Sequence, residues 1–172
     1  MKRVKPLVWG VLLAGVWMLA SSDVMPDRYG GWAPYFMQRA DLERSVKMAP
    51  EAREMVDPGK LWIAGDKIYV VERYKGVHII DNSDPANPRP TGFLIAPGCM
   101  DVALRGDVIY LDNAVDLVAF DLSTGAETSR LRNYFPPPAS PVGDRYHNFD
   151  YGSSDMIPVG WKRVVREGKN GL

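Results

Sequence analysis

Between residues 60 and 132 the chain alternates short apolar runs with turn-forming residues, and the same order of runs occurs twice. Short apolar runs bounded by Gly, Pro, Asn or Asp are typical of β-strands. The first set spans 61–64, 67–72, 77–81 and 91–95, and the second spans 100–105, 108–112, 115–121 and 127–132. Each set predicts a four-stranded antiparallel meander. Most runs are continuously apolar, which predicts sheets covered on both faces.

The two sets are copies of one repeat. Gly65, Asp66 and Tyr69 recur 41 positions later as Gly106, Asp107 and Tyr110, and Asp81 and Ser83 recur 40 positions later as Asp121 and Ser123. A period of about 40 residues with several short strands per copy is typical of a β-propeller blade. A closed propeller needs about four to eight blades. Two blades therefore leave apolar faces that another part of the chain or another protein must cover.

Weaker patterns flank the repeats. Residues 23–38 mix Gly and Pro with aromatic residues and predict an extended arm. Apolar residues one helical turn apart predict a short helix from Arg39 to about Lys47, which Pro50 ends. A turn is expected at 57–59, directly before the first repeat. The proline-rich stretch 135–141 fits neither helix nor central strand, and 157–161 predicts one edge strand.

We therefore predict an all-β fold: two four-stranded antiparallel β-propeller-like blades, forming an incomplete propeller, with an N-terminal signal helix, an extended arm and one short helix. The predicted segments are a signal peptide or N-terminal anchor at 1–22, the arm and short helix at 23–59, the two repeats at 60–132, and a proline- and aromatic-rich tail at 133–172.

The first residues predict export. Lys2, Arg3 and Lys5 precede an uncharged apolar run at 7–20 that small residues follow, which is the pattern of a secretory signal peptide. The run falls short of the roughly 20 residues that span a bilayer. We expect a location in the periplasm or at the cell surface, with membrane contact only through an uncleaved N-terminal segment.

Charge and cysteine content narrow the function classes. The chain has 21 basic and 21 acidic residues, and no basic patch argues for a nucleic-acid partner. Cys99 is the only cysteine, so no disulfide forms within the chain. Its setting between apolar strands favours a small buried hydrophobe over a reactive thiol.

Residues for catalysis are few. His78 lies within a predicted strand and is expected to be half-exposed in the sheet, whereas His147 lies in a loop, where functional residues are more common. A dyad of Cys99 with His147 stays open as an alternative. No zinc-protease, phosphate-loop or serine-hydrolase motif is present in the sequence. We therefore expect no enzymatic activity, no catalytic residues, no cofactor and no metal ligands.

Three further groups of polar or aromatic side chains are better explained by structural roles than by catalysis. The cluster 81–84 has the oxygen atoms that a Ca²⁺ loop uses, but Asx turns between strands explain it better. Asp101, Asp112 and Asp116 are expected to form an acidic patch on one rim if the blades stack in register. Aromatic residues outside the repeat core predict a lid over the sheet faces, with interface anchors as the alternative. These aromatic residues are Trp32, Tyr35, Tyr134, Phe135, Tyr146, Phe149, Tyr151 and Trp161.

The repeats resemble the LVIVD repeat of bacterial and archaeal surface and envelope proteins. The motifs that carry the resemblance read HIIDNSDPANP at 78–88 and LVAFDLS at 117–123. The flanks at 36–39, 42–47 and 159–161 are similar to those of lipoprotein members of that family. The resemblance implies β-propeller blades and no known catalytic activity.

Two departures from the family affect what the resemblance implies. Ser22 stands where family lipoproteins carry the acylated Cys, and the sequence has two repeats where family members continue into more. The expected function is a non-enzymatic exported scaffold or protein-interaction module. Its partner would be another protein, or a second copy, at the exposed blade faces. The alternative is a truncated or partner-completed propeller with a ligand-binding or hydrolytic site.

Overall fold

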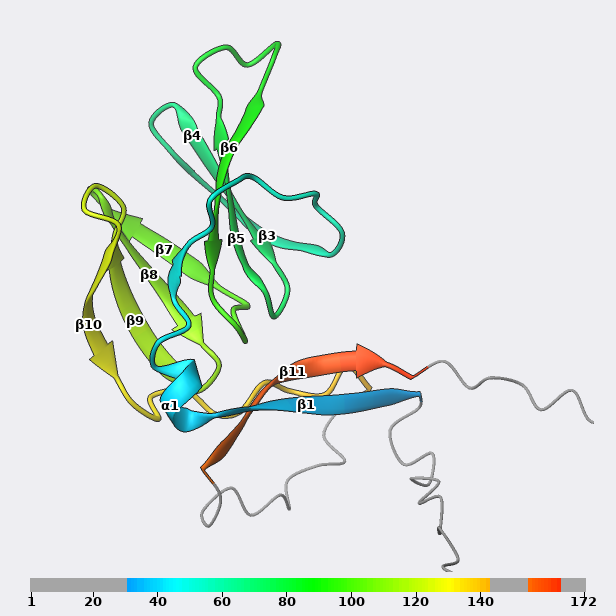
Figure 1. Cartoon of the computed structure of the whole chain (residues 1–172). Coiled ribbons are helices and arrows are strands. Elements are labelled where there is room, and N and C mark those ends of the chain that lie inside the picture. Colours follow the sequence, from blue (N-terminus) through cyan, green and yellow to red (C-terminus); the bar gives the residue numbers. More distant parts are fainter. Residues whose placement is uncertain (1–30, 143–154, 165–172) are drawn as a thin grey trace, which may run out of the picture.

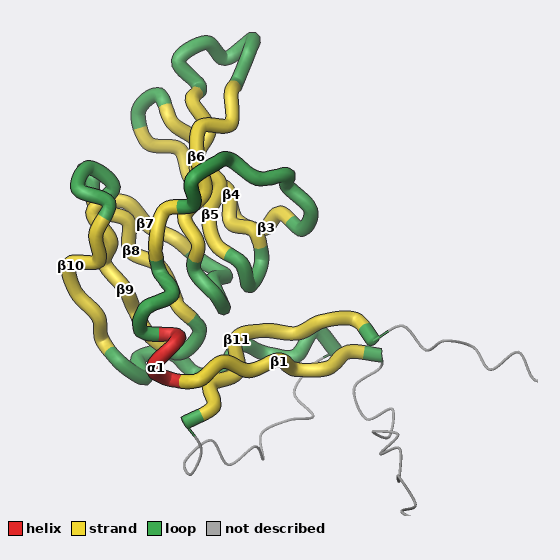
Figure 2. The backbone as a smooth tube through the Cα atoms, viewed as in Figure 1, coloured by secondary structure: helices red, strands yellow, loops and turns green. Residues whose placement is uncertain are grey.

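The computed structural model describes residues 31–142 and 155–164, and within these ranges it is all-β with one short helix (Figures 1 and 2). The predicted signal helix at 1–22 lies outside the described residues. The elements are β1 (Trp32–Gln38), α1 (Arg39–Leu42), β2 (Lys47–Met48), β3 (Pro58–Ala64), β4 (Lys67–Glu72), β5 (Gly76–Asp81), β6 (Arg89–Ile95), β7 (Val102–Arg105), β8 (Val108–Asn113), β9 (Asp116–Asp121), β10 (Ala126–Leu131) and β11 (Met156–Arg163).

Two antiparallel meanders form the body of the described chain, as the repeat predicts. The first blade has the strand order β2-β6-β5-β4-β3, and the second has the order β10-β9-β8-β7. Gly65 and Gly106 hold equivalent hairpin turns with φ of 56° and 60°. Glycine adopts such left-handed angles without steric cost, which explains its recurrence at both turns. The predicted all-β architecture of two propeller-like blades is confirmed.

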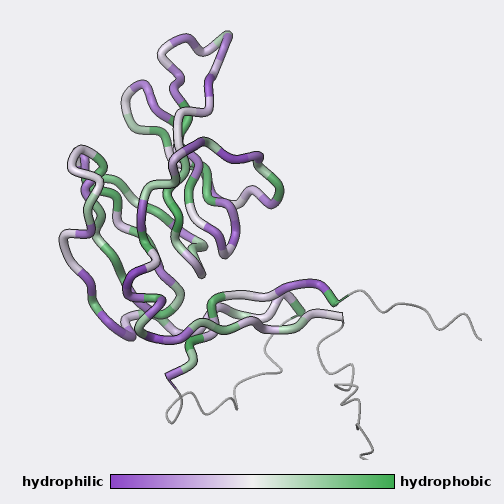
Figure 3. Tube along the Cα trace, in the orientation of Figure 1, coloured by the Kyte–Doolittle hydropathy of each residue, from purple (hydrophilic) through white to green (hydrophobic). Residues whose placement is uncertain are grey.

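One apolar core joins the two blades. Tyr69, Val71, Val77, Ile79 and Leu94 from the first blade share it with Val102, Ile109, Leu111, Val118 and Phe120 from the second. Residues two apart on a strand share a face, so these side chains all point from their sheets into the same layer. Figure 3 shows the apolar stretches along the blade strands and polar residues at many of the turns.

The outer face of the first blade is crossed by residues 49–57, which we name the crossover (Figure 1). This segment connects β2, at one edge of the sheet, with β3 at the other. The Ala49 amide donates to the Phe93 carbonyl at 2.8 Å, and the Arg53 guanidinium lies 4.8 Å from the Phe93 ring centroid. Beneath it, Val70, His78 and Phe93 are buried. The crossover therefore closes much of this face.

The second blade is different on its outer face. Along β8 and β9 buried and more exposed residues alternate, whereas β4 and β5 contain continuous buried runs. The prediction of sheets covered on both faces is thus correct for β4 and β5 of the first blade and wrong for the second blade.

The predicted helix is too long. The helix ends at Leu42, and Lys47–Met48 instead pairs with β6 as strand β2. The Ser45 hydroxyl donates to the Leu42 carbonyl at 2.7 Å, so a side chain occupies an acceptor that a continuing helix would use. Val46 lies in the core between the blades, apart from the cluster that contains Leu42. Tertiary packing overrides the helical spacing of these two residues.

The remaining strands form a two-stranded ribbon. β1 pairs with β11 from Trp32↔Arg163 to Gln38↔Met156, which confirms an extended arm and a strand at 157–161. Strands β1 and β11 form a separate two-stranded sheet, so neither strand extends a blade. The predicted turn at 57–59 is shorter than expected, because β3 already begins at Pro58. Proline is tolerated as the first residue of an edge strand.

Candidate functional site

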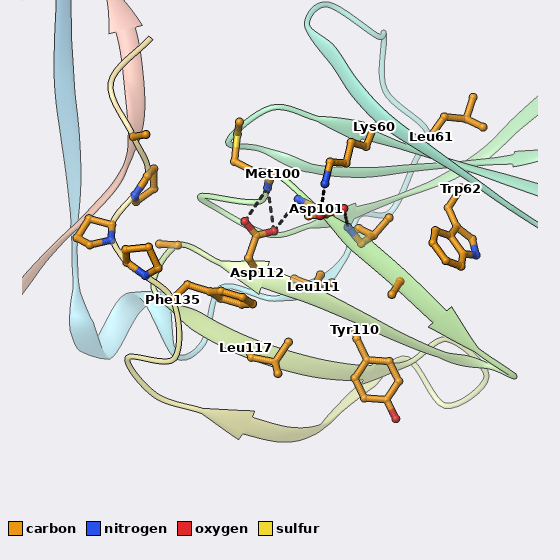
Figure 4. Close-up of a pocket in the computed structure, with 17 residues that line it drawn as sticks. Lys60, Leu61, Trp62, Met100, Asp101, Tyr110, Leu111, Asp112, Leu117 and Phe135 are labelled. Carbon is orange, nitrogen blue, oxygen red and sulfur yellow. Dashed lines mark hydrogen bonds and ion pairs between the residues drawn. The ribbon is translucent and has the colours of Figure 1, made fainter. Parts of the chain in front are cut away.

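A cavity of about 910 Å³ lies against the outer face of the second blade (Figure 4). Strands β7, β8 and β9 form its floor, β3 of the first blade forms one rim, and residues 135–139 form a wall. Its lining is mainly apolar, with a few charged groups at the edge. This composition and size are typical of binding sites in proteins.

The floor follows from strand alternation. In β8, Ile109 and Leu111 point into the core, so Tyr110 and Asp112 point outward. Tyr110 pairs with Ala103 on β7 and with Ala119 on β9. Directly paired residues project from the same face of a sheet. The centre of the outer face is therefore a row of small, large and small side chains, which we name the Tyr110 row (Ala103, Tyr110, Ala119).

The wall is the proline-rich segment that follows the second blade. The Phe135 amide donates to the Val115 carbonyl at 2.9 Å, and the Trp161 indole N–H donates to the Pro138 carbonyl at 2.9 Å. Proline has no amide hydrogen, so 136–138 runs beside the sheet without pairing into it. Figure 4 shows the Phe135 ring at this end of the cavity. The wall covers the end of the floor near Leu117 and leaves the Tyr110 row uncovered.

The rim on β3 exposes large apolar side chains. Leu61, Trp62 and Ile63 are 55%, 42% and 61% exposed, although they lie in a strand. Lys60 forms an ion pair with Asp101, which links β3 to the loop before β7. Of these three residues, Leu61 and Trp62 line the cavity together with the floor.

Asp112 lies on β8, in the floor of the cavity, and its hydrogen bonds are structural. It accepts from the Met100 amide at 2.9 Å and from the Asp101 amide at 2.8 Å. Burial raises the pKa of Asp112 above its usual range, although these amides and the Cys99 thiol act in the opposite direction. A perturbed carboxyl beside a cavity is a common feature of active sites. Here the carboxylate holds the loop between the blades in place.

Cys99 is fully buried in the core between the blades, so the prediction of a small buried hydrophobe is confirmed. Burial raises the pKa of its thiol well above the usual value, and Asp112 adds to this effect. A thiol with a raised pKa is a weak nucleophile. His147 lies outside the described residues, and the Cys99/His147 pairing stays untested.

His78 is buried, and the prediction of a half-exposed position is wrong. Its Nε2 lies 3.1 Å from a carboxylate oxygen of Glu72, and its ring packs edge-on against Phe93. The reason is the crossover, which covers a face that a single sheet would leave open to water. The sequence shows no signal for this covering, because the crossover itself is polar and aperiodic.

Glu72 fixes the crossover to the sheet. It accepts from the Asp57 amide at 2.7 Å and from the Val56 amide at 3.1 Å. Burial by itself would raise the pKa of Glu72, but these amides and the side chains of His78 and Lys75 outweigh it and lower the pKa. Sequence reasoning missed this group of interactions, since the partners are separated by a turn and a loop.

The predicted acidic rim does not form. Asp101 and Asp112 are neighbours near the cavity, but Asp116 is buried elsewhere, where Arg39 and Arg130 donate to it at 2.8 and 2.9 Å. Its position on β9 has the same parity as the core residue Val118, which turns it away from the outer face. The cluster at 81–84 forms Asx turns as predicted, with the Ser83 amide donating to Asp81 at 2.9 Å. In the described ranges no group of three or more His, Cys, Asp or Glu residues is placed to hold a metal ion.

The aromatic lid is correct in part. Phe135 lies against the cavity and Trp161 holds the wall, but Tyr134 is 61% exposed. Trp32 and Tyr35 belong to the β1–β11 ribbon. Tyr146, Phe149 and Tyr151 lie outside the described residues. The aromatic residues that sequence reasoning missed are Trp62 and Tyr110, since both were assigned to the repeat core.

Comparison with protein-family models gives no match, and comparison with curated proteins gives none either. Among solved structures, the chain is similar to the N-terminal domain of Nup159, a β-propeller, at 24% identity and a TM-score of 0.36. That match covers 47% of this chain and 22% of the other. A chain in an S. cerevisiae complex that contains Dbp5, Nup159 and Gle1 matches with the same identity and TM-score, over 21% of its length. This chain thus spans about a fifth of the structures it resembles.

Within the described part of the chain, no helix has the length and apolar character needed to cross a membrane.

Proposed function

We propose that this protein is a non-enzymatic, exported envelope protein whose two LVIVD-type blades form a scaffold that binds another protein chain. The observation that carries the proposal is the contrast between the two outer faces. The crossover closes much of the first, whereas the Tyr110 row on the second lies open beside an apolar cavity. Exposed apolar surface of this kind marks interaction sites.

Three sequence features support export and the repeat class. The basic residues and apolar run within 1–22 fit a signal peptide, and the repeats at 60–132 carry the LVIVD-like motifs. The envelope is where proteins with this repeat occur, so the two arguments agree on location.

The chemistry of the cavity supports binding over catalysis. The Asp112 carboxylate accepts hydrogen bonds from backbone amides, and the Cys99 thiol is buried with a raised pKa. A nucleophile needs a base within hydrogen-bond reach. Among the residues that line the cavity, the remaining polar side-chain groups are the Lys60–Asp101 ion pair, the Tyr110 hydroxyl and the Trp62 indole N–H. The surface is best suited to an apolar partner.

The proposal is tested in cells that express the full chain. After fractionation we expect the protein in the envelope, and a short amine-reactive crosslinker should give products larger than one chain. Ala119→Glu places a charge on the open face and should abolish these products. Val56→Glu, on the crossover, should leave them unchanged. A cytosolic protein, or products that Ala119→Glu does not affect, would contradict the proposal.

A further inference from the structure

We infer that the outer face of the second blade binds the same face of a second copy of this chain, related by a twofold axis. This inference rests on the proposed function and names its partner. The Tyr110 row forms the centre of the interface, and Trp62 on the β3 rim lies at its border.

The first step is the exclusion of head-to-tail stacking. In a propeller, a third blade would pack on the open face of the second blade. The face that it would use for this contact is equivalent to the outer face of the first blade. In this chain the equivalent face is crossed by residues 49–57, which Glu72 and Phe93 hold in place. Sheets stack face to face at about 10 Å. The crossover occupies that space, so a second copy cannot dock through its first blade.

A symmetric contact stays available because both copies have an open second blade. In a twofold interface the same patch contacts itself. The Tyr110 row suits this, since a large side chain stands between two alanines. When two such rows face each other across an axis, the tyrosine of one copy fits above an alanine of the other. Such self-complementary packing is what a closed dimer requires.

The charges near the Tyr110 row are compatible with a twofold interface. A twofold axis brings each central charge close to its own copy, so a charged centre repels itself. The Tyr110 row is uncharged, and the nearby Lys60 and Asp101 neutralise each other within the chain. The next row on the same face carries one charge of each sign, Arg105 and Asp121. Asp112 faces the end of the floor that the proline-rich wall covers.

The contact also continues an interface that the chain already uses. The core between the blades ends at Trp62, whose partner Tyr69 lies inside that core. Trp62 is 42% exposed and Tyr110 is 37% exposed, and both line the cavity. Aromatic residues of this kind are the usual energetic centre of protein interfaces. A second copy would bury them without any change to the fold.

The test uses the full chain carrying a photo-crosslinking phenylalanine analogue at position 110, co-expressed in two forms with different affinity tags. Irradiation should give a covalent product of about twice the 19.2 kDa chain mass that contains both tags. The same analogue at position 56, on the crossover, is the matched control and should give no such product. Equal melting temperatures of the two proteins show that both are folded.

A solution measurement checks the same face without the analogue. Ala119→Lys places a positive charge in the interface on each copy and should raise the dimer dissociation constant more than about tenfold. Light scattering should then report a monomer at concentrations where Val56→Lys stays dimeric.

Three results would overturn the inference. A position-110 product that joins this chain to a different protein refutes self-association but leaves the proposed function standing. The absence of any product between chains from position 110 refutes both. A wild-type chain that scatters as a monomer throughout the micromolar range also refutes self-association.

Discussion

Asp116 shows how strongly a single buried residue is held in this protein. It is fully buried, and its carboxylate accepts from Arg39, Arg130 and the amide of Asn133. Burial opposes ionisation, but these donors outweigh it and lower the pKa of Asp116. Because Arg39 begins α1 directly after β1 and Arg130 lies on β10, Asp116 ties the ribbon to the second blade.

We expect Asp116→Asn to lower the free energy of unfolding by about 3 kcal/mol, because it leaves Arg39 without its charge partner and Arg130 with Glu127 alone. Arg39 and Arg130 are 19% and 9% exposed, so water replaces the lost partner poorly. Urea denaturation of the full chain measures the change. Asp41→Asn is the control, since its pair with Arg44 is exposed and should contribute less than about 1 kcal/mol. Equal effects of the two substitutions would contradict the interpretation.

Glu72 predicts a pH dependence with a definite sign. Its pKa is lowered in the folded protein, so the folded state favours the ionised carboxylate. This stability is complete above the unfolded pKa of about 4.3 and is lost as the pH falls from there through the folded pKa. Asp112 has a raised pKa and acts in the opposite direction.

Comparison of wild type with Glu72→Gln at each pH therefore isolates the contribution of Glu72. We expect the stability difference between the two proteins to shrink as the pH is lowered from about 5 toward 3. Thermal unfolding at several pH values measures it. A difference that stays constant with pH would show that the carboxylate charge does not contribute.

Among the elements, the blade strands could be predicted from the sequence, whereas the pairing of β2 with β6 could not. The eight blade strands follow from apolar runs and from turn residues such as Gly65 and Gly106, whose φ angles favour glycine. Strand β2 has two residues and no apolar pattern, so only its pairing with β6 defines it. The short helix was overestimated because Val46 is drawn into the core between the blades.

Gly76, the first residue of β5, and Gly125, in the turn before β10, differ in the space around them. A Cβ at Gly76 would lie 2.0 Å from the Leu94 carbonyl oxygen, whereas one at Gly125 would meet nothing within 4 Å. Both have positive φ, so each alanine substitution carries a conformational cost of about 1–2 kcal/mol. Gly76→Ala must also move the backbone of β6.

We therefore expect Gly76→Ala to reduce the free energy of unfolding by several kcal/mol, on the order of 3 or more, and Gly125→Ala by about 1 kcal/mol. Chemical denaturation of both variants gives the comparison. Similar losses at the two positions would show that the close approach of β5 to β6 is relaxed at little cost.

For the molecule as a whole, the repeat predicts that a blade face is left uncovered, but it does not predict which face. The cavity depends on where the proline-rich wall stops and on the crossover closing the opposite side of the molecule. Neither follows from local pattern, because 49–57 and 135–139 have no period and are placed by single contacts such as those to Glu72 and Pro138. The candidate site was therefore found from the fold, and Trp62 and Tyr110 were identified only there.

The two blades should unfold as one unit, because the largest apolar core is shared between them. Leu111 on β8 is buried in the same cluster as Val77 on β5. We expect Leu111→Ala to cost about 2–5 kcal/mol, as large-to-small core substitutions do. The loss should appear equally in both blades. Hydrogen exchange with mass spectrometry, followed through increasing urea, should show amides of β4–β5 and β8–β9 losing protection at one concentration. Loss of protection in β8–β9 alone would mean that the first blade, closed by its crossover, is stable independently of the second.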